Sequence, residues 1–264
     1  DDFALAAGGD GWDGDKYSGT RGTINVTLNG SYDSIVKNDI VASDKGVINI
    51  GRDASYAGKL NIEGNILAGA GMYSKGTVTV DFGNKGLFIG IADDYRNKIN
   101  PKLLDEPILD AGVIDLTFGE GSIWNMTGDS CMNNLVANKS TIDMTADNKA
   151  FSSLHTNKFA GDDNTIKMDI DASTNVDNSD RVYVDGVHEG VHYITLDNVA
   201  ADGTFDGAEG TVLVSVKDEK GEFKANDSEG TLYWNKYDLA KYEEDNGDTV
   251  TNGYTTDWLS LIHI

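Results

Sequence analysis

Few residues of this chain are arranged for nucleophilic catalysis. Gly128-Asp129-Ser130 has the order of the Gly-Asp-Ser block of some esterases, but the leucine that follows such a block is absent. The candidate bases are His155, His188, His192 and His263, and no nucleophile-elbow motif accompanies them. His192 alternates with Val191 and Tyr193, which indicates a position on a strand face. We interpret the Gly-Asp-Ser triplet as a turn and expect no catalytic residue.

Two groups of aspartates have a spacing that could bind calcium. They are Asp10, Asp13 and Asp15 near the start, and Asp169, Asp171, Asp177 and Asp180 farther along the chain. Neither group has the glycine and the distal glutamate of an EF-hand loop. Solvated turns are the simpler interpretation, and we expect no metal and no cofactor.

The composition excludes several classes of function. The 264 residues carry a formal net charge of −23, which disfavours a nucleic-acid partner because phosphate binding needs a basic face. Cys131 is the single cysteine, so an intrachain disulfide cannot form. The sequence has no apolar run of 18 residues and no basic segment of a signal peptide at Asp1-Asp2-Phe3, so we expect a mature form or an excised fragment.

Short alternating segments recur through the chain and predict an all-β fold. A frame of one small or polar residue followed by alternating aliphatic residues begins at positions 22, 46, 76, 112, 140, 164, 190 and 210. Alternation puts every second side chain on one face of a strand. A frame that returns at such intervals favours a solenoid, whose coils bring the chain back to the same face. We expect coils of three short strands and three turns, some eight to ten in number.

The same pattern predicts which side chains form the core and how the chain divides. Ile142, Met144, Ile166 and Met168 should point inward from neighbouring coils. We treat residues 1–264 as one β-helix domain, with N-terminal coils over 1–120, a loop insert near 93–107, regular coils over 121–200 and a cap over 201–264. The stretch from Thr231-Leu232-Tyr233-Trp234 to Trp258-Leu259-Ser260-Leu261-Ile262 should close the end with antiparallel strands.

An ordered series of motifs over residues 121–200 resembles the passenger of pertactin-like autotransporters. Ser122-Ile123-Trp124-Asn125-Met126-Thr127-Gly128-Asp129-Ser130 is similar to the W-x-V-T-G-x-S strand of that family. Residues 135–143, 151–161 and 169–192 continue with segments similar to those that follow it, including Ser179-Asp180-Arg181-Val182-Tyr183-Val184. His155 and Met168 depart from the family, which has aliphatic residues there. Residues 200–264 have no counterpart that can be aligned.

The resemblance implies a right-handed parallel β-helix that is exported across the outer membrane of a bacterium. In this family the C-terminal part of the passenger helps the rest to fold outside the cell, and it precedes a translocator β-barrel. The expected function is therefore that of a non-enzymatic, surface-exposed or secreted passenger of adhesin or virulence type. Its further partner would be an unidentified receptor or glycan on a host or neighbouring cell.

The alternative is a β-helical enzyme, a lyase or hydrolase that degrades polysaccharides. Such an enzyme needs a groove in which carboxylates and a basic residue converge, whereas a passenger stem needs only side-chain ladders and solvated turns. Most of the large aromatic residues follow residue 120, and the frame is most regular there. We therefore expect the C-terminal half to be the more stable part and to template the rest.

Overall fold

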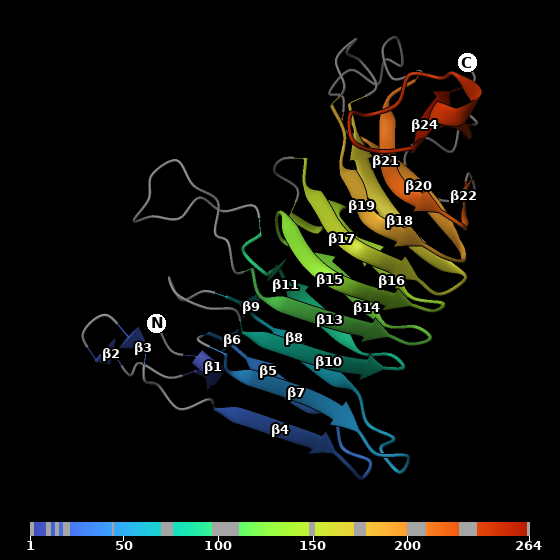
Figure 1. Ribbon diagram of the computed structural model, residues 1–264. Helices are drawn as coiled ribbons and strands as arrows, with labels where there is room; N and C mark the ends of the chain where they lie inside the picture. Colours follow the sequence, from blue (N-terminus) through green and yellow to red (C-terminus); the bar gives the residue numbers. More distant parts are fainter. Residues whose placement is uncertain are drawn as a thin grey trace. The chain divides into compact units, whose positions relative to one another are not determined.

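The computed structural model describes residues 3–8, 12–13, 16–17, 22–43, 45–69, 76–96, 111–147, 151–171, 178–199, 210–226 and 237–262. The protein is a parallel β-solenoid of about six turns with antiparallel strands at its C-terminal end, and about 3% of it is helical. The predicted fold class is confirmed. The chain divides into two compact units, Asp1–Ser122 with Ser130–Leu135, and Ile123–Asp129 with Val136–Ile264 (Figure 1).

Unit 1 has three-sided coils, and each coil gives one strand to each of three parallel sheets. The first sheet contains β4 (Thr23–Leu28), β7 (Val47–Arg52), β10 (Thr77–Gly83) and β13 (Val113–Phe118). The second contains β5 (Ser34–Lys37), β8 (Leu60–Glu63) and β11 (Leu87–Gly90). The third contains β1 (Phe3–Ala7), β6 (Asp39–Ala42), β9 (Ile66–Ala68), β12 (Ala92–Asp93) and the first residues of β15 (Ser130–Ala137). A separate antiparallel pair is formed by β2 (Trp12–Asp13) and β3 (Lys16–Tyr17).

In-register stacking places like side chains above one another in the core of unit 1. Ile24, Ile48, Val78 and Ile114 are successive register partners in the first sheet. Within this column Ile48, Val78 and Ile114 are fully buried. The outward residues that follow them, Asn25, Asn49, Thr79 and Asp115, are polar, and Asn49 Nδ2 donates a hydrogen bond to Asn25 Oδ1 at 2.8 Å. The alternation read from the sequence therefore describes the two faces of these strands correctly.

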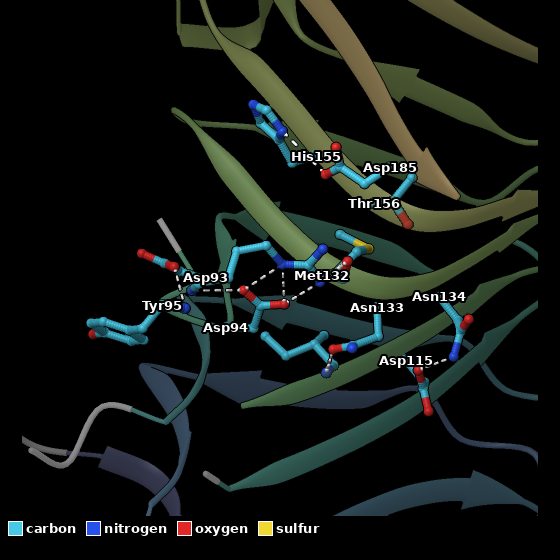
Figure 2. A network of polar contacts seen from close by, with 12 residues as sticks. Asp93, Asp94, Tyr95, Asp115, Met132, Asn133, Asn134, His155, Thr156 and Asp185 are labelled. Atoms are coloured by element: carbon cyan, nitrogen blue, oxygen red, sulfur yellow. Dashed lines mark hydrogen bonds and ion pairs between the residues drawn. The ribbon is translucent and has the colours of Figure 1, made fainter. Parts of the chain in front are cut away.

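A buried ion pair marks the point where the chain leaves the coils after β12. The Asp94 side chain is fully buried and accepts hydrogen bonds from Arg96 Nε, at 2.8 Å to Oδ2, and from Arg96 Nη2 (Figure 2). Arg96 Nη2 also donates to the carbonyl of Met132 on β15. The N–H of Gly112 donates to the carbonyl of Asp94 at 2.8 Å, so the chain returns beside its point of departure. The loop predicted over 93–107 falls mostly on residues 97–110, which lie outside the described residues.

Unit 2 uses two long strands per coil where the sequence suggested three short ones. One sheet holds β14 (Ile123–Met126), β16 (Thr141–Asp143), β18 (Asn164–Ile170), β20 (Val191–Asn198) and β22 (Glu222–Ala225). The other begins with β17 (Ser153–Ala160), β19 (Arg181–His188) and β21 (Val212–Glu219). The register of β17 against β19 shifts between Thr156 and Lys158, and a similar shift follows Val184. These β-bulges bend a continuous strand at a place where unit 1 uses a turn.

The recurring frame does not mark a single face of the solenoid, which corrects the predicted number of coils. Frames at 22, 46, 76 and 112 lead into β4, β7, β10 and β13, whereas those at 140, 164 and 190 lead into β16, β18 and β20 of another sheet. The frame at 210 leads into β21. Any strand with one buried face after a corner can produce this pattern, so the number of frames does not give the number of coils. The count of coils is therefore about six, and the expected eight to ten is wrong.

The predicted inward positions of unit 2 are confirmed. Ile142, Met144, Ile166 and Met168 are fully buried, and Ile142 and Ile166 are register partners on β16 and β18. Thr165 and Lys167 alternate with them and are half-buried on the outer face. A charge at these positions would be buried among apolar side chains.

We predict that Ile166→Asp lowers the free energy of unfolding by roughly 4 kcal/mol, because it places an unpaired carboxylate in this column. Urea unfolding followed by circular dichroism measures the loss. Thr165→Asp is the matched control, since it adds the same charge one residue away on the outer face and should cost less than about 1 kcal/mol. Equal midpoints for the two variants would contradict the assignment of faces.

Candidate functional site

The C-terminal end of unit 2 changes strand direction and forms a cap. Strand β24 (Thr256–Ile262) pairs with β21 in antiparallel fashion, with Trp258 opposite Val214. Strand β23 (Tyr237–Glu243) is antiparallel to β24 along its whole length. An antiparallel strand ends the parallel ladder and covers its exposed edge. The predicted antiparallel closure is confirmed for residues 237–262, while Thr231 to Trp234 lie outside the described residues.

Tight glycine corners bring the side chains of the site together. Gly161 and Gly190 have φ values of 113° and 101°, which favour glycine. A Cβ on Gly190 would lie 1.8 Å from the carbonyl oxygen of Gly161, so adjacent corners touch through their backbones. The corner at Gly190 joins β19 to β20 and sets His188 and His192 on either side of it. Their ring centroids are 4.9 Å apart.

Glu219 links this corner to the cap through an inner clamp formed by Glu219, His188 and Trp258. Its carboxylate accepts a hydrogen bond from His188 Nδ1, from Trp258 Nε1 at 2.9 Å and from the N–H of Gly221 at 2.8 Å. The side chains of His188 and Glu219 are 0% and 3% exposed, respectively. Burial opposes ionisation of Glu219, but the hydrogen bonds from His188 and Trp258 outweigh it and lower its pKa. One carboxylate thus ties β19, β21 and β24 together.

Aromatic rings fill the interior beside the inner clamp. Phe159 stacks on His192 with centroids 4.3 Å apart, and His188 stacks on Phe223 at 4.2 Å. Trp258 meets Phe223 edge-on at 5.8 Å. Such pairs stabilise a core beyond the area that they bury, by about 0.5–1.5 kcal/mol each. The stack therefore joins four coil strands, β17, β19, β20 and β22, to the cap.

His192 is held neutral by this environment. Its Nδ1 faces the side-chain amide of Asn164, and its Nε2 faces the carbonyl of Glu189 at 3.3 Å. Burial, together with the neighbouring His188, lowers the pKa of His192 to about 4. A proton on this ring would be a charge in the core, so acidification should act on the cap through His192.

An outer clamp, formed by Asp185, His155, Lys217 and Tyr254, ties the cap to the other side of the same strands. Tyr254 OH donates to Asp185 Oδ1 at 2.8 Å, while His155 Nδ1 lies 3.5 Å from Oδ2 (Figure 2 shows the latter pair). Lys217 Nζ lies 3.6 Å from Oδ1. Burial opposes ionisation of Asp185, yet the hydrogen bonds from His155 and Tyr254 prevail and lower its pKa. Burial and the bond to Asp185 raise the pKa of Tyr254.

Stacked rings extend the outer clamp along the strand faces. His155 and Tyr183 are register partners on β17 and β19, and their rings stack at 4.3 Å. Arg181 lies over Tyr183 at 5.5 Å from the ring centroid, and Lys217 lies over Tyr254 at 5.4 Å. The loop that carries Tyr254 is therefore held by π contacts and by the hydrogen bond to Asp185.

Tyr237 anchors the last described segment of the chain to the coils. Its ring is 1% exposed, and its hydroxyl lies 2.6 Å from the carbonyl of Ile194 and 2.9 Å from that of Asn226. These carbonyls belong to β20 and to the end of β22, whereas Tyr237 begins β23. The cap is thus fixed at three places: the inner clamp, the outer clamp and this tyrosine.

A shallow polar cleft of about 260 Å³ lies beside the inner clamp. It is lined by Lys217, Asp218, Glu219, Glu243, Asp245, Thr255 and Thr256. Three of the four carboxylates that line it are engaged in ion pairs or hydrogen bonds: Asp218 with Lys220 at 2.8 Å, Glu243 with Lys241 at 2.6 Å, and Glu219 in the inner clamp. The geometry is that of a structural junction with a solvated rim.

The Gly-Asp-Ser triplet forms the predicted turn between β14 and β15. Asp129 Oδ1 accepts hydrogen bonds from the N–H and Oγ of Ser153 at 2.8 and 2.9 Å. Ser130 is buried, and its Oγ accepts a hydrogen bond from the N–H of Ala92 at 3.3 Å. Both side chains hold neighbouring strands, which is a structural role.

The structure brings together His188 with His192 and Asp169 with Asp180, among the histidines and aspartates singled out in the sequence. Asp180 is buried, and its two carboxylate oxygens accept hydrogen bonds from the N–H groups of Ser152 and Asp169, each at 2.6 Å. The side chains of Asp10, Asp13 and Asp15, together with Asp177 and His263, lie outside the described residues. Within the described ranges, no cluster of three or more His, Cys, Asp or Glu residues is placed to hold a metal ion.

The helices in those ranges include none long and apolar enough to cross a membrane.

Glu219 and Asp185 are the functional residues that sequence reasoning missed. Each lies on a strand in an alternating pattern, and nothing in its immediate sequence separates it from the many solvated acidic residues of the chain. The sequence pointed to these residues only indirectly. The aromatic residues near the C-terminus predicted a cap, and the polar atoms of its buried Trp and Tyr side chains need hydrogen-bond acceptors. Trp258 was identified in this way, while its acceptor was not.

Comparison with known proteins finds that part of the chain is similar to a described family. Residues 130–234 match the family model of the autochaperone domain type 1, a domain of autotransporters. The predicted resemblance to an autotransporter passenger is thereby confirmed. No curated protein sequence matches this one. The crystal structure of the Haemophilus influenzae Hap adhesin is similar, with 15% sequence identity and a TM-score of 0.44, over 91% of this chain and 24% of that one. This chain therefore spans about a quarter of the length of that structure.

The neutral His192 predicts a loss of stability on acidification. The pKa of this ring is about 4 in the folded protein and 6.5 in an unperturbed chain, so between these values the unfolded state binds more protons. The free energy of unfolding should fall by about 3 kcal/mol as the pH drops from 6.5 to 4. Glu219 and Asp185 act in the same direction, because a lowered carboxyl pKa gives stability that is lost on protonation at lower pH.

Urea unfolding of the parent, His192→Phe and His155→Phe at a series of pH values tests this assignment. His192→Phe keeps a ring on Phe159 and should lose less stability than the parent between pH 6.5 and 4. His155→Phe removes an outer histidine and should retain the parent's drop. If the free energy of unfolding fell equally with pH in all three proteins, His192 would be excluded as the source of the loss of stability.

Proposed function

We propose that this chain is part of an autotransporter passenger whose capped C-terminal unit promotes the folding of the coils that precede it. The single observation that carries the proposal is that two clamps attach the cap to the coils. The inner and outer clamps hold β24 and the Tyr254 loop to strands β17, β19 and β21. The match of residues 130–234 to an autochaperone domain supports the same assignment.

The physical basis of the proposed role is the unfavourable free energy of forming the first coil of a solenoid. A coil gains its hydrogen bonds from its neighbours, so the first coil to form has no template and must be stabilised in another way. The cap supplies that stabilisation locally, because β21, β23 and β24 pair within a short stretch of chain. Once β21 and β19 are fixed, each preceding strand meets a formed edge with a complementary row of buried side chains.

We also propose where in or outside the bacterial cell this chain acts. A passenger is expected at the bacterial surface or outside the cell, with a translocator β-barrel in its precursor. We propose an adhesive or virulence-type role, with an unidentified receptor or glycan as the partner. Binding of the whole chain to host cells and to glycan panels tests this part.

A non-enzymatic function fits the cleft better than polysaccharide cleavage does. A lyase or hydrolase needs carboxylates that are free to transfer protons in the presence of substrate. In the described cleft, Asp218, Glu219 and Glu243 are already paired, and Glu219 supports the fold. Absence of product from acidic and neutral polysaccharides incubated with the chain is the expected result; release of sugars would favour the enzyme.

We predict that Glu219→Ala slows refolding by about tenfold or more, because it opens the inner clamp before the coils can form on it. Stopped-flow fluorescence after dilution from urea measures the rate. Ile48→Ala is the comparison, because it costs a similar stability through a cavity in unit 1. It should accelerate unfolding and change the refolding rate by less than about twofold. The reverse pattern would place the folding nucleus in the N-terminal coils.

Limited proteolysis in moderate urea should leave a resistant C-terminal fragment that begins near residues 105 to 120. The reason is that the aromatic stack and both clamps lie in unit 2, whereas the N-terminal end of unit 1 has half-buried inward side chains. Mass spectrometry of the surviving fragment gives its start. Survival of the N-terminal half with digestion of residues 121–264 would contradict the proposed order of stability.

A further inference from the structure

The loop that carries Tyr254 contains an exposed Asn-Gly pair. Asn252 and Gly253 are the two central residues of a β-turn, in which the N–H of Tyr254 donates to the carbonyl of Thr251 at 3.0 Å. Gly253 has a φ of 86°, whereas the φ of Asn252 is negative, and this combination fits a type II turn. Both central residues are exposed. A Cβ on Gly253 would meet no described atom within 4 Å, so the backbone of this pair is open to solvent.

An asparagine that precedes a glycine is prone to spontaneous deamidation, because glycine has no side chain to shield its backbone nitrogen. That nitrogen attacks Cγ of the asparagine side chain. The bond from nitrogen to Cγ forms, the bond from Cγ to Nδ2 breaks, and ammonia leaves with the proton of the backbone amide. Water then opens the resulting five-membered imide. Opening at Cγ gives aspartate, and opening at the main-chain carbonyl gives isoaspartate, whose backbone runs through Cβ.

The attacking nitrogen of Gly253 is not engaged in the turn. The hydrogen bond of a β-turn joins its outer residues, so the amide between the two central residues takes no part in it. Within the described part of the chain, the N–H of Gly253 donates to no acceptor. Removal of its proton by hydroxide, which activates the nitrogen, is therefore opposed by no hydrogen bond.

A second Asn-Gly pair in the same region is arranged differently. Asn246 ends the short helix η2 (Glu244–Asn246), and Gly247 follows it. The N–H of Gly247 donates to the carbonyl of Glu244 at 2.9 Å, and Asn246 Nδ2 donates to Glu243 Oε2 at 3.0 Å. Both reacting groups are held there, so this pair should react more slowly than Asn252 and Gly253.

The turn at Asn252 is held on both sides by the rest of the cap. Before it, the N–H and Oγ1 of Thr251 donate to Asp257 Oδ2 at 2.6 and 2.8 Å. After it, Tyr254 OH donates to Asp185, and the N–H of Thr255 donates to a carbonyl of β21 at 3.0 Å. The span that the two central residues must bridge is thus fixed at both ends.

We propose that Asn252 is a site of spontaneous deamidation, and that its conversion to isoaspartate releases Tyr254 from the outer clamp. Isoaspartate adds one carbon atom to the main chain, an extra bond of about 1.5 Å. A type II turn has no place for this atom, so the hydrogen bond from Tyr254 to the carbonyl of Thr251 is lost. Thr251 stays bound to Asp257 through two hydrogen bonds, so the displacement falls on Tyr254. The cap therefore weakens with the age of the protein, and water is the only other reactant.

Peptide mapping of the whole chain, incubated for increasing times in mildly alkaline buffer, measures the reaction. Labelling with isoaspartyl methyltransferase identifies the product. Isoaspartate should accumulate at Asn252 roughly fivefold faster than at Asn246, a factor of the size that one ordinary hydrogen bond represents. Equal rates at the two positions, or a faster reaction at Asn246, would overturn the assignment of the site.

Urea unfolding of fresh and aged protein measures the effect on the cap. Ageing of the parent should raise the equilibrium constant for unfolding by about tenfold, because the hydrogen bond from Tyr254 to a carboxylate is lost. Asn252→Ala should keep its fresh value. Asn29→Ala is the matched control, because it removes another exposed Asn-Gly pair, which belongs to unit 1, and it should age like the parent. Asn252→Asp adds the charge without the longer backbone and should unfold like the fresh parent.

Tyr254→Phe tests the route by which the modification acts. This variant lacks the hydroxyl that binds Asp185, so ageing should weaken it much less than it weakens the parent. An equal loss in the two proteins would contradict the release of Tyr254. An aged Asn252→Ala that weakens as much as the aged parent would reject Asn252 as the source.

Discussion

A strand in a parallel solenoid obtains its backbone hydrogen bonds from the coils on either side, and every other feature of this protein depends on that constraint. Strand register, the columns of buried aliphatic residues and the outward polar ladders follow from it, because each coil repeats the position of its neighbour. The same constraint creates a problem at each end, where one side of every strand has no coil beside it.

The C-terminal end solves it with an antiparallel cap and polar side chains buried beneath it. Glu219 is an expensive group to bury, and it is stable there because three donors surround it. Asp185 plays a corresponding part on the outer side, where tyrosine, histidine and lysine share its charge. Placing the attachments on several strands means that the cap and the coils beneath it stabilise each other.

Much of the fold could be predicted from the sequence because strand alternation is a local property. Ile142 and Ile166 were assigned to the core from their neighbours alone, and the aromatic residues near Trp258 indicated the cap. The number of coils could not be predicted in this way, since the frame at residue 140 looks like the frame at residue 112 but enters a different sheet. Nor could the bulge after Thr156, because its bend depends on packing against strands that are distant in sequence.

The clamps were beyond prediction for a related reason. Glu219 and Trp258 are 39 residues apart, and Asp185 and Tyr254 are 69 residues apart. With 44 acidic residues in the chain, no local pattern identifies the two that hold the cap. Only the three-dimensional path of the chain brings each of them to its partners.

The glycine corners have a consequence for how such a chain can change in length during evolution. A Cβ on Gly161, Gly190 or Gly221 would lie 2.0, 1.8 or 2.3 Å, respectively, from a carbonyl oxygen of the preceding corner. Point substitutions there are therefore unfavourable, and so is the loss of a few residues, which would move a corner off the column. Removal or duplication of a whole segment from one glycine to the next preserves every contact of that kind. The gene can thus lengthen or shorten the solenoid by whole coils without losing these contacts.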